Sequence, residues 1–379
     1  MNILIVSRTD FNPLKGGIER VTEILTNKLK KNHKILYLCL VHSENDNCYA
    51  PSVETFFFPS EDIYSNENIE FYNYFLEKHN INIIINQYGS FRESDLFLNI
   101  KNKSIKKISV IHSNPRLIYD TYSSYILSQK SCLKYFKYLF TPLLKYRYLY
   151  YRKKHYRKLV NLSDHVVLLS NNYIPLFNCF NNSKITAIPN PCSFNVKNHI
   201  SSKRKEILYV GKLNFEDKQS NILIRIWENI YAKYPDWKLI IVGDGPGRIK
   251  LEEYVIMKKI ERIEFKGFCQ PQKYYQTASI FAMTSSNEGF PMVLPEAMQH
   301  SCVPIIFNTY AAATDIIDNN INGILIPFKN IKFYIKKTCD LIDNPQLLKK
   351  MSYNAYLKSQ KFNVHNIINS WEKLFTDNM

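Results

Sequence analysis

The chain alternates short, continuous apolar runs with longer stretches whose apolar residues recur at helical spacing. Continuous apolar runs are typical of parallel strands that are buried on both faces, whereas the helical spacing indicates amphipathic helices. The expected strands are residues 3–6, 35–40, 81–85, 108–111, 166–169, 207–210, 239–242, 263–265, 280–283 and 303–307. Strands that alternate with helices predict an α/β fold built on doubly wound parallel sheets.

The alternation is interrupted near residues 185–195, where the sequence reads Ile-Pro-Asn-Pro and leads into a polar, basic stretch. We interpret this segment as the linker between two Rossmann-like domains, residues 1–195 and 196–357, which are followed by a C-terminal segment, residues 358–379. Within that segment, residues 362–375 place apolar side chains on one face and predict a helix. Because open α/β sheets bind ligands beyond the carboxyl ends of their strands, we expect a central cleft lined by the loops that follow strands.

The balance of charge favours polyanionic partners. Lys and Arg number 50 against 33 Asp and Glu, which gives a formal net charge of +17. Such a charge suits anionic lipid surfaces, nucleic acid or phosphorylated ligands. None of the eight cysteines forms a C-x-x-C pair, which argues against a zinc site and for a reducing compartment. With no targeting pattern and no apolar run long enough to span a bilayer, we expect a cytoplasmic protein.

Residues 121–163 concentrate positive charge, with ten Lys and Arg, no Asp or Glu, and interleaved tyrosines. This composition suits the headgroup layer of an anionic membrane. It equally suits a nucleic-acid backbone with stacked bases, or a solvated helix pair on the surface. The ten cations are Lys130, Lys134, Lys137, Lys145, Arg147, Arg152, Lys153, Lys154, Arg157 and Lys158.

Two glycine motifs stand where loops follow expected strands. Gly16-Gly17 precedes the first helix, where free amides and the helix dipole attract an anion, although a flexible turn has the same sequence. Gly211-Lys212 ends a strand, and Lys218 follows. Two ammonium groups there suit a diphosphate leaving group, and two solvated surface lysines are the alternative.

A third motif, Gly243-Asp244-Gly245-Pro246-Gly247-Arg248, resembles a dinucleotide fingerprint only in part. The fingerprint requires glycine where Arg248 stands, and no acidic residue follows at the distance needed to bind the ribose. We therefore interpret it as a tight strand-to-helix turn that lines the cleft.

The strongest motif is the segment of residues 285–298, which leads from a strand into a helix. Its prolines suit a loop and a first helical turn. The amides of Met292, Val293 and Leu294 are expected to face a phosphate. Glu288 and Glu296 place a carboxylate on each side of this turn, and carboxylates accept strong hydrogen bonds from sugar and ribose hydroxyls.

Taken together, these motifs resemble the retaining glycosyltransferases of family 4, the group 1 glycosyl transferases, which have the two-Rossmann-domain GT-B fold. Residues 288–296 resemble the E-x7-E element of that family, and the resemblance spans residues 1 to about 375. The matching elements, in chain order, are Gly16-Gly17, His112, Gly211-Lys212 with Lys218, Gly243 to Pro246, Gly267-Phe268, and Glu288 to Glu296.

The resemblance implies a role for each matching residue. Lys212 and Lys218 would bind the donor diphosphate, Glu288 the transferred sugar, and Glu296 the ribose. His112 would lie near the reacting face of the sugar. The backbone cradle would be Gly289, Phe290, Pro291, Met292, Val293 and Leu294, with Phe268 against the base. The C-terminal helix would return to the N-terminal domain.

The chain departs from the family pattern at three places. Lys212 stands where arginine is frequent, which removes the bidentate fork of a guanidinium. Gln219 replaces a frequent glycine, and Asn190-Pro191 replaces Asn-Gly. None of these changes removes a charge, so donor binding is expected to persist.

The predicted function is therefore transfer of a hexosyl or N-acetylhexosaminyl group from a nucleotide-diphosphate sugar, with uridine as the expected base. The resemblance implies front-face substitution with retention, without a metal or a resident cofactor. The expected acceptor is a lipid-linked glycan, lipopolysaccharide or capsule precursor, at the inner face of the bacterial cytoplasmic membrane, which residues 121–163 would contact. A sugar-nucleotide epimerase, a basic nucleic-acid-binding protein and a catalytically inactive scaffold are the alternatives.

Overall fold

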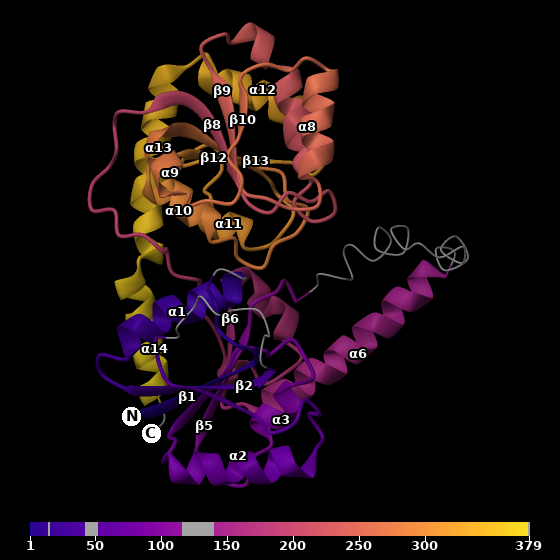
Figure 1. The fold of residues 1–379 in the computed structure, drawn as a ribbon, viewed down its shortest axis with the longest axis vertical. Coiled ribbons are helices and arrows are strands. Elements are labelled where there is room, and N and C mark those ends of the chain that lie inside the picture. Colours follow the sequence, from indigo (N-terminus) through magenta and orange to yellow (C-terminus); the bar gives the residue numbers. More distant parts are fainter. Residues whose placement is uncertain (14–15, 42–51, 116–139, 378–379) are drawn as a thin grey trace. The chain divides into compact units, whose positions relative to one another are not determined.

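The computed structural model describes residues 1–13, 16–41, 52–115 and 140–377, and the chain divides into two compact units (Figure 1). The first unit comprises Met1–Pro189 and Ile368–Met379, and the second comprises Asn190–Ile367. The first unit thus ends before residue 195, where the sequence placed the boundary. The linker is divided between the units: its first residues form β7 (Ile185–Ala187) of the first unit, whereas residues from Asn190 belong to the second, where the Cys192 amide donates to the Phe362 carbonyl at 2.7 Å.

The first unit contains a seven-stranded parallel sheet in the order β3-β2-β1-β4-β5-β6-β7. Its inner strands are largely buried on both faces, as the continuous apolar runs predict, whereas the edge strands β3 and β7 are only partly buried. Its elements are β1 (Asn2–Thr9), α1 (Gly17–Leu29), β2 (Lys34–Val41), β3 (Thr55–Phe57), α2 (Asn66–Lys78), β4 (Ile83–Asn86), α3 (Ser94–Leu98), β5 (Lys106–Ile111), α6 (Thr141–Leu162), β6 (His165–Leu168), η1 (Asn171–Phe177), η2 (Asn182–Lys184) and β7 (Ile185–Ala187).

The second unit contains a six-stranded parallel sheet in the order β10-β9-β8-β11-β12-β13. Its core packs Trp227, Tyr334 and aliphatic side chains against the strands. Its elements are β8 (Arg204–Val210), α7 (Ser220–Glu228), η3 (Tyr231–Lys233), β9 (Lys238–Val242), α8 (Arg248–Met257), β10 (Ile263–Phe265), α9 (Gln272–Thr277), β11 (Ala278–Met283), α10 (Val293–Gln299), β12 (Val303–Phe307), α11 (Ala313–Ile316), β13 (Ile324–Ile326), α12 (Ile331–Ile342), α13 (Pro345–Ser359) and η4 (Gln360–Phe362).

The predicted α/β architecture with two Rossmann-like sheets is confirmed. In each sheet the strand order reverses direction at one position, between β1 and β4 in the first unit and between β8 and β11 in the second. Such a switch point leaves a crevice at the carboxyl ends of the strands, which is where open α/β sheets bind ligands.

The last helix, α14 (Val364–Thr376), packs on the first unit. Its residues Trp371, Leu374 and Phe375 are buried. His33 hydrogen-bonds Glu372 at 2.9 Å, and the Lys106 ammonium donates to the Leu374 carbonyl at 2.8 Å. The predicted return of the C-terminal helix to the N-terminal domain is therefore confirmed.

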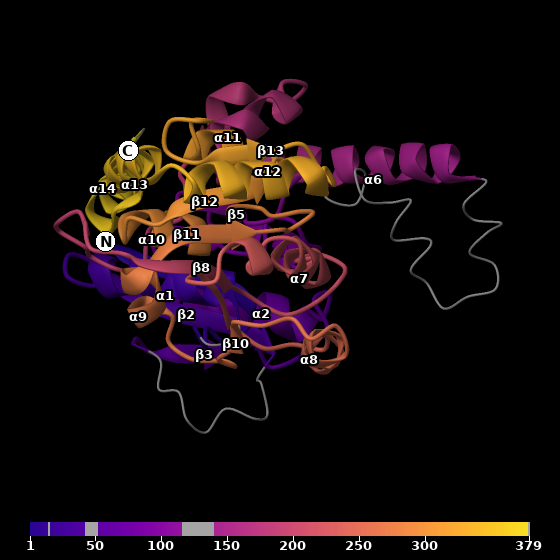
Figure 2. The ribbon, with the colours of Figure 1, turned by 90° about the horizontal axis from the view of Figure 1, so that it is seen from above.

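The helix α6 extends away from the sheet of the first unit, in both views of the ribbon (Figures 1 and 2). Near its C-terminal end, Tyr156, Leu159 and Val160 are buried against the unit. The part of the basic segment before residue 140, with Lys130, Lys134 and Lys137, lies outside the described residues. The described remainder of the segment forms the single helix α6.

Candidate active site

The switch point of the second unit brings together a lysine and a glutamate. Lys218 lies in the loop after β8, and Glu288 lies in the loop after β11, the neighbouring strand. Lys218 Nζ is 2.6 Å from Glu288 Oε1, and the two side chains are 29% and 13% exposed. A partly buried ammonium–carboxylate pair thus stands where the fold places its ligands.

The loop that carries Lys218 is held by hydrogen bonds from both sides. The Lys218 amide donates to Asn214 Oδ1 at 2.7 Å. Thr284, at the end of β11, donates its hydroxyl toward the carbonyls of Lys218 and Gln219 at 3.0 and 3.1 Å. Gln219 itself has a φ of +47°, a left-handed conformation that favours glycine. This conformation gives a physical reason why the family pattern frequently has glycine at the position of Gln219.

The loops after β8 and β9 approach each other through their backbones. The Gly211 amide donates to the Val242 carbonyl, and the Leu213 amide donates to the Asp244 carbonyl. Gly243 has a φ of +135°, and a Cβ there would lie 2.0 Å from the Gly211 carbonyl oxygen. The glycines of this motif therefore serve a tight strand-to-helix turn, as the sequence predicts. Lys212, next to Gly211, is exposed.

The segment from Gly289 to Leu294 offers backbone atoms more than side chains. Phe290, Pro291, Met292 and Leu294 are buried, which leaves little of them to face a ligand. The expectation of a free Leu294 amide is wrong, because this amide donates to the Pro291 carbonyl at 3.1 Å in a tight turn at the start of α10. The amides of Met292 and Val293 remain candidates.

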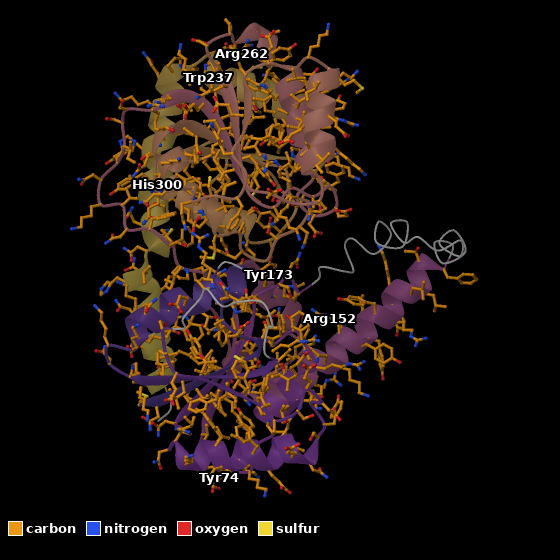
Figure 3. The ribbon with its side chains drawn as sticks, in the orientation of Figure 1. Tyr74, Arg152, Tyr173, Trp237, Arg262 and His300 are labelled. Atoms are coloured by element: carbon orange, nitrogen blue, oxygen red, sulfur yellow. The ribbon has the colours of Figure 1, made fainter. Side chains whose placement is uncertain are left out.

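The carboxylate of Glu296 is enclosed. Glu296 is 0% exposed, and both of its oxygens accept hydrogen bonds from hydroxyl groups. Ser193 donates to Oε1 at 2.5 Å, and Tyr275 donates to Oε2 at 3.3 Å. The ring of His300 stacks on Tyr275 (Figure 3 labels His300). A ribose can reach this carboxylate only if the surrounding side chains rearrange.

Phe268 presents an exposed aromatic ring beside the same loops. It follows Gly267, whose carbonyl accepts a hydrogen bond from the Gly243 amide at 2.8 Å. The Phe268 side chain is 70% exposed. An exposed ring at this end of the sheet is available to stack on a base, as the sequence analysis expects.

The remaining candidates lie in the first unit, at the carboxyl ends of its strands. Gly16 precedes α1 in an extended conformation, and Gly17 is the first residue of that helix. His112 follows β5, and its Nε2 lies 2.5 Å from Gln87 Oε1. Burial lowers the pKa of His112 to about 4, so its imidazole is neutral at physiological pH.

Three residues were missed by the sequence analysis: Gln87, Ser193 and Tyr275. Gln87 stands two residues after the expected strand of residues 81–85, so the rule that sites follow strands could have identified it. Ser193 and Tyr275 carried no such signal, since their contacts with Glu296 exist only in the folded unit.

Across residues 1–13, 16–41, 52–115 and 140–377, no group of three or more His, Cys, Asp or Glu side chains is arranged to hold a metal ion. Within the same ranges, no helix combines the length and the apolar character needed to cross a bilayer.

Residues 193–358, which include Lys218, Glu288 and Glu296, match the family model for glycosyl transferases group 1. Residues 193–358 are a group 1 glycosyl transferase domain. Within this glycosyl transferase domain, Lys218 and Glu288 occupy the switch point and Glu296 lies in α10.

Two curated relatives place the domain in context. An uncharacterized glycosyltransferase of Haemophilus influenzae is 31% identical over 198 residues, which cover 51% of this chain and 55% of that protein. The amylovoran biosynthesis glycosyltransferase AmsD of Erwinia amylovora is 28% identical over 227 residues, or 56% of this chain and 62% of that protein. The chain thus spans somewhat more than half the length of these relatives.

Among solved structures, TarM of S. aureus, in a complex with UDP and alpha-GlcNAc-glycerol, has a similar fold. Its TM-score is 0.74, with 16% identity over 99% of this chain and 100% of that one. This similarity confirms the fold that the sequence predicts.

Proposed function

We propose that the protein is a retaining glycosyltransferase that transfers a hexosyl or N-acetylhexosaminyl group from a UDP-sugar to a hydroxyl of a glycan. The pair of Lys218 and Glu288 at the switch point carries this proposal. An ammonium group suits the diphosphate of such a donor, and a carboxylate suits its sugar hydroxyls. The complex of TarM with UDP supports the donor class, and the naming of AmsD for amylovoran biosynthesis supports a glycan acceptor.

Each donor-binding residue has a proposed partner. Lys218 and Lys212 bind the diphosphate. Because Lys218 is already paired with Glu288, the exposed Lys212 supplies the additional positive charge. Glu288 binds the transferred sugar, and Phe268 stacks on the base. Glu296 accepts hydrogen bonds from the ribose hydroxyls, which replace those that it now accepts from the Ser193 and Tyr275 hydroxyls.

The proposed reaction exchanges one bond at the anomeric carbon for another on the same face. The bond to the leaving phosphate oxygen breaks as the acceptor oxygen bonds to the carbon, and the acceptor proton passes to the departing phosphate. The two lysines stabilise the negative charge that develops on the diphosphate. The scheme needs no metal ion, and we expect turnover to persist in a chelator.

We propose further that the acceptor is lipid-linked and that α6 contacts an anionic membrane, at the inner face of the cytoplasmic membrane. The helix carries seven Lys and Arg and no acidic residue. Tyr146, Tyr150 and Tyr151 are all more than half exposed. Cations interleaved with exposed tyrosines suit a headgroup layer.

The C-terminal half of α6 is fixed to the unit, which leaves the rest of the helix to project. Arg152, labelled in Figure 3, donates to the Ser90 carbonyl at 3.2 Å, and His155 hydrogen-bonds the Gly89 carbonyl at 3.0 Å. Lys158 pairs with Asp95 at 2.8 Å. With this half anchored, the exposed Lys153 and Lys154 and the preceding tyrosines are available to lipid.

The test is release of nucleotide from a panel of nucleotide sugars, with a membrane lipid extract as the acceptor source. We expect release with one donor, stimulated by the extract, and loss of release in Glu296→Ala. Conversion of the donor to an isomer, without release, would instead identify an epimerase. A second arm measures binding to an oligonucleotide at rising salt. Tight binding that persists at physiological salt would favour the nucleic-acid alternative.

A further inference from the structure

Gln87 and His112 extend from adjacent strands of the first unit. Strand β4 ends at Asn86, which pairs with Ser109 of β5, so the loops after both strands emerge side by side. The Gly89 amide donates to the Val110 carbonyl at 3.1 Å, and a Cβ at Gly89 would lie only 2.6 Å from that oxygen. This close backbone approach fixes the loop that carries Gln87 against β5.

The contact between the two side chains determines which nitrogen of the imidazole carries hydrogen. His112 Nε2 lies 2.5 Å from Gln87 Oε1, and Gln87 is 2% exposed, so water does not compete for this bond. A carboxamide oxygen only accepts hydrogen bonds, so the imidazole nitrogen must donate. In a neutral ring with hydrogen on Nε2, Nδ1 keeps its lone pair.

We propose that Gln87 is a positioning residue that holds His112 as the neutral Nε2–H tautomer, so that Nδ1 accepts a hydrogen bond from a sugar hydroxyl. The identity of that hydroxyl rests on the proposed function, whereas the tautomer does not. The tautomer matters because an imidazole with hydrogen on Nδ1 would present a donor to the same hydroxyl.

The groups around the loop support a neutral ring. Burial disfavours the imidazolium and lowers the pKa of His112 to about 4. The titratable groups in and around the loop of residues 87–90 include Tyr88 itself and Glu19 and Glu93, whose charges act on Tyr88. From α6 they include Arg152, His155 and Tyr156. Among the described residues, no carboxylate hydrogen-bonds His112, and burial is the cause of the shift in its pKa.

The experiment is nitrogen NMR of the full chain with labelled histidine, which reports the protonation of each ring nitrogen directly. In the wild type we expect His112 to carry hydrogen on Nε2 and to keep this state from pH 7 down to pH 5. The lower limit, pH 5, is still roughly one unit above the pKa of His112. A His112 ring with hydrogen on Nδ1, or one already charged at pH 6, would overturn the proposal.

Two variants and a control extend the test. Gln87→Glu keeps the acceptor but adds a negative charge, so the pKa of His112 should rise by at least about one unit. Gln87→Leu removes the acceptor, and both neutral tautomers should then appear. The exposed Gln272→Glu in the other unit should leave the His112 signals unchanged. An unchanged pKa in Gln87→Glu would contradict the proposal, and the wild-type spectrum decides the tautomer even if neither variant folds.

An assay of sugar transfer separates failure of this inference from failure of the proposed function. If sugar transfer is found, Gln87→Leu should lower kcat by about tenfold or more, because the reacting geometry is lost, with little change in donor KM. The expected tautomer without any sugar transfer would leave this inference standing and contradict the proposed function. Hydrogen on Nδ1 of His112 in an enzyme that does transfer sugar would contradict this inference and leave the proposed function standing.

Discussion

Lys218 Nζ lies 2.6 Å from Glu288 Oε1, and these two residues lie in loops that follow neighbouring strands of the second unit. The pair spans the position where the strand order reverses. A cation and a carboxylate are therefore fixed together at the point where the fold leaves room for a ligand. In the proposed reaction, they bind the two halves of the donor.

The first prediction concerns this pair. Lys218→Met and Glu288→Gln should each lower kcat/KM for the donor by about 100-fold, since each removes a charged partner of the donor. The double variant should lose less than the product of the two single effects, because the residues act as a unit. Steady-state kinetics of the four proteins measures this coupling. Fully multiplicative losses would show that the residues act independently.

The second prediction concerns backbone strain at Gln219. Its left-handed conformation disfavours a side chain, and its buried Oε1 has no hydrogen-bond partner among the described residues. Gln219→Gly should therefore raise the free energy of unfolding by about 1 kcal/mol, measured by denaturant titration. Gln346→Gly, in the first turn of α13, is the matched control and should lower the free energy of unfolding. A loss of stability in Gln219→Gly would contradict the account.

The third prediction concerns pH. His112 has a pKa of about 4 in the folded chain, against an ordinary value of 6.5. Between these values the unfolded chain binds a proton that the folded chain does not. The buried neutral His112 therefore contributes up to about 3 kcal/mol to the free energy of unfolding. This contribution is fully present above pH 6.5 and is lost as the pH falls toward 4.

Unfolding titrations at several pH values check this prediction. His112→Asn should flatten the fall in the free energy of unfolding between pH 6.5 and 4. The exposed His365→Asn is the control and should leave the slope as in the wild type. An identical slope in His112→Asn and in the wild type would refute the contribution of His112.

The fourth prediction concerns α6. The double variant Lys153→Glu and Lys154→Glu should lower binding to vesicles that contain anionic lipid by about tenfold or more, at about 1 kcal/mol for each charge near the surface. The same reversal at the exposed Lys101 and Lys103 of the same unit serves as control. Co-sedimentation with anionic and with neutral vesicles measures the effect. Equal binding by both double variants would exclude a specific role for the helix.

The sequence predicted the larger strands but not all of the sheet edges. All ten expected strands are present, and for most of them a continuous apolar run is the signature of a strand covered on both faces. The exception is β10, which contains Glu264 and forms a sheet edge. In the part of the chain that the structure describes, the strands that were not predicted are β3, β7 and β13. Each has three residues and forms the edge of its sheet, where a short segment carries little apolar signal.

The site was predictable in its charges but not in its supporting contacts. Lys218 and Glu288 could be anticipated from their motifs, although only the folded unit joins them in an ion pair. The enclosure of Glu296 by Ser193 and Tyr275 was not predictable, because these residues lie far from it in the sequence and belong to no motif. Long-range hydrogen bonds to a buried carboxylate arise from packing, and sequence spacing does not encode them.

The most direct test of the central claim is calorimetric titration of the full chain with UDP. The account predicts saturable binding to the wild type and at least about tenfold weaker binding to Lys218→Met, a loss of about 1.4 kcal/mol. The exposed Lys332→Met, elsewhere in the same unit, should bind as the wild type does. Absence of binding to UDP, ADP and GDP, or equal binding by wild type and Lys218→Met, would contradict the account.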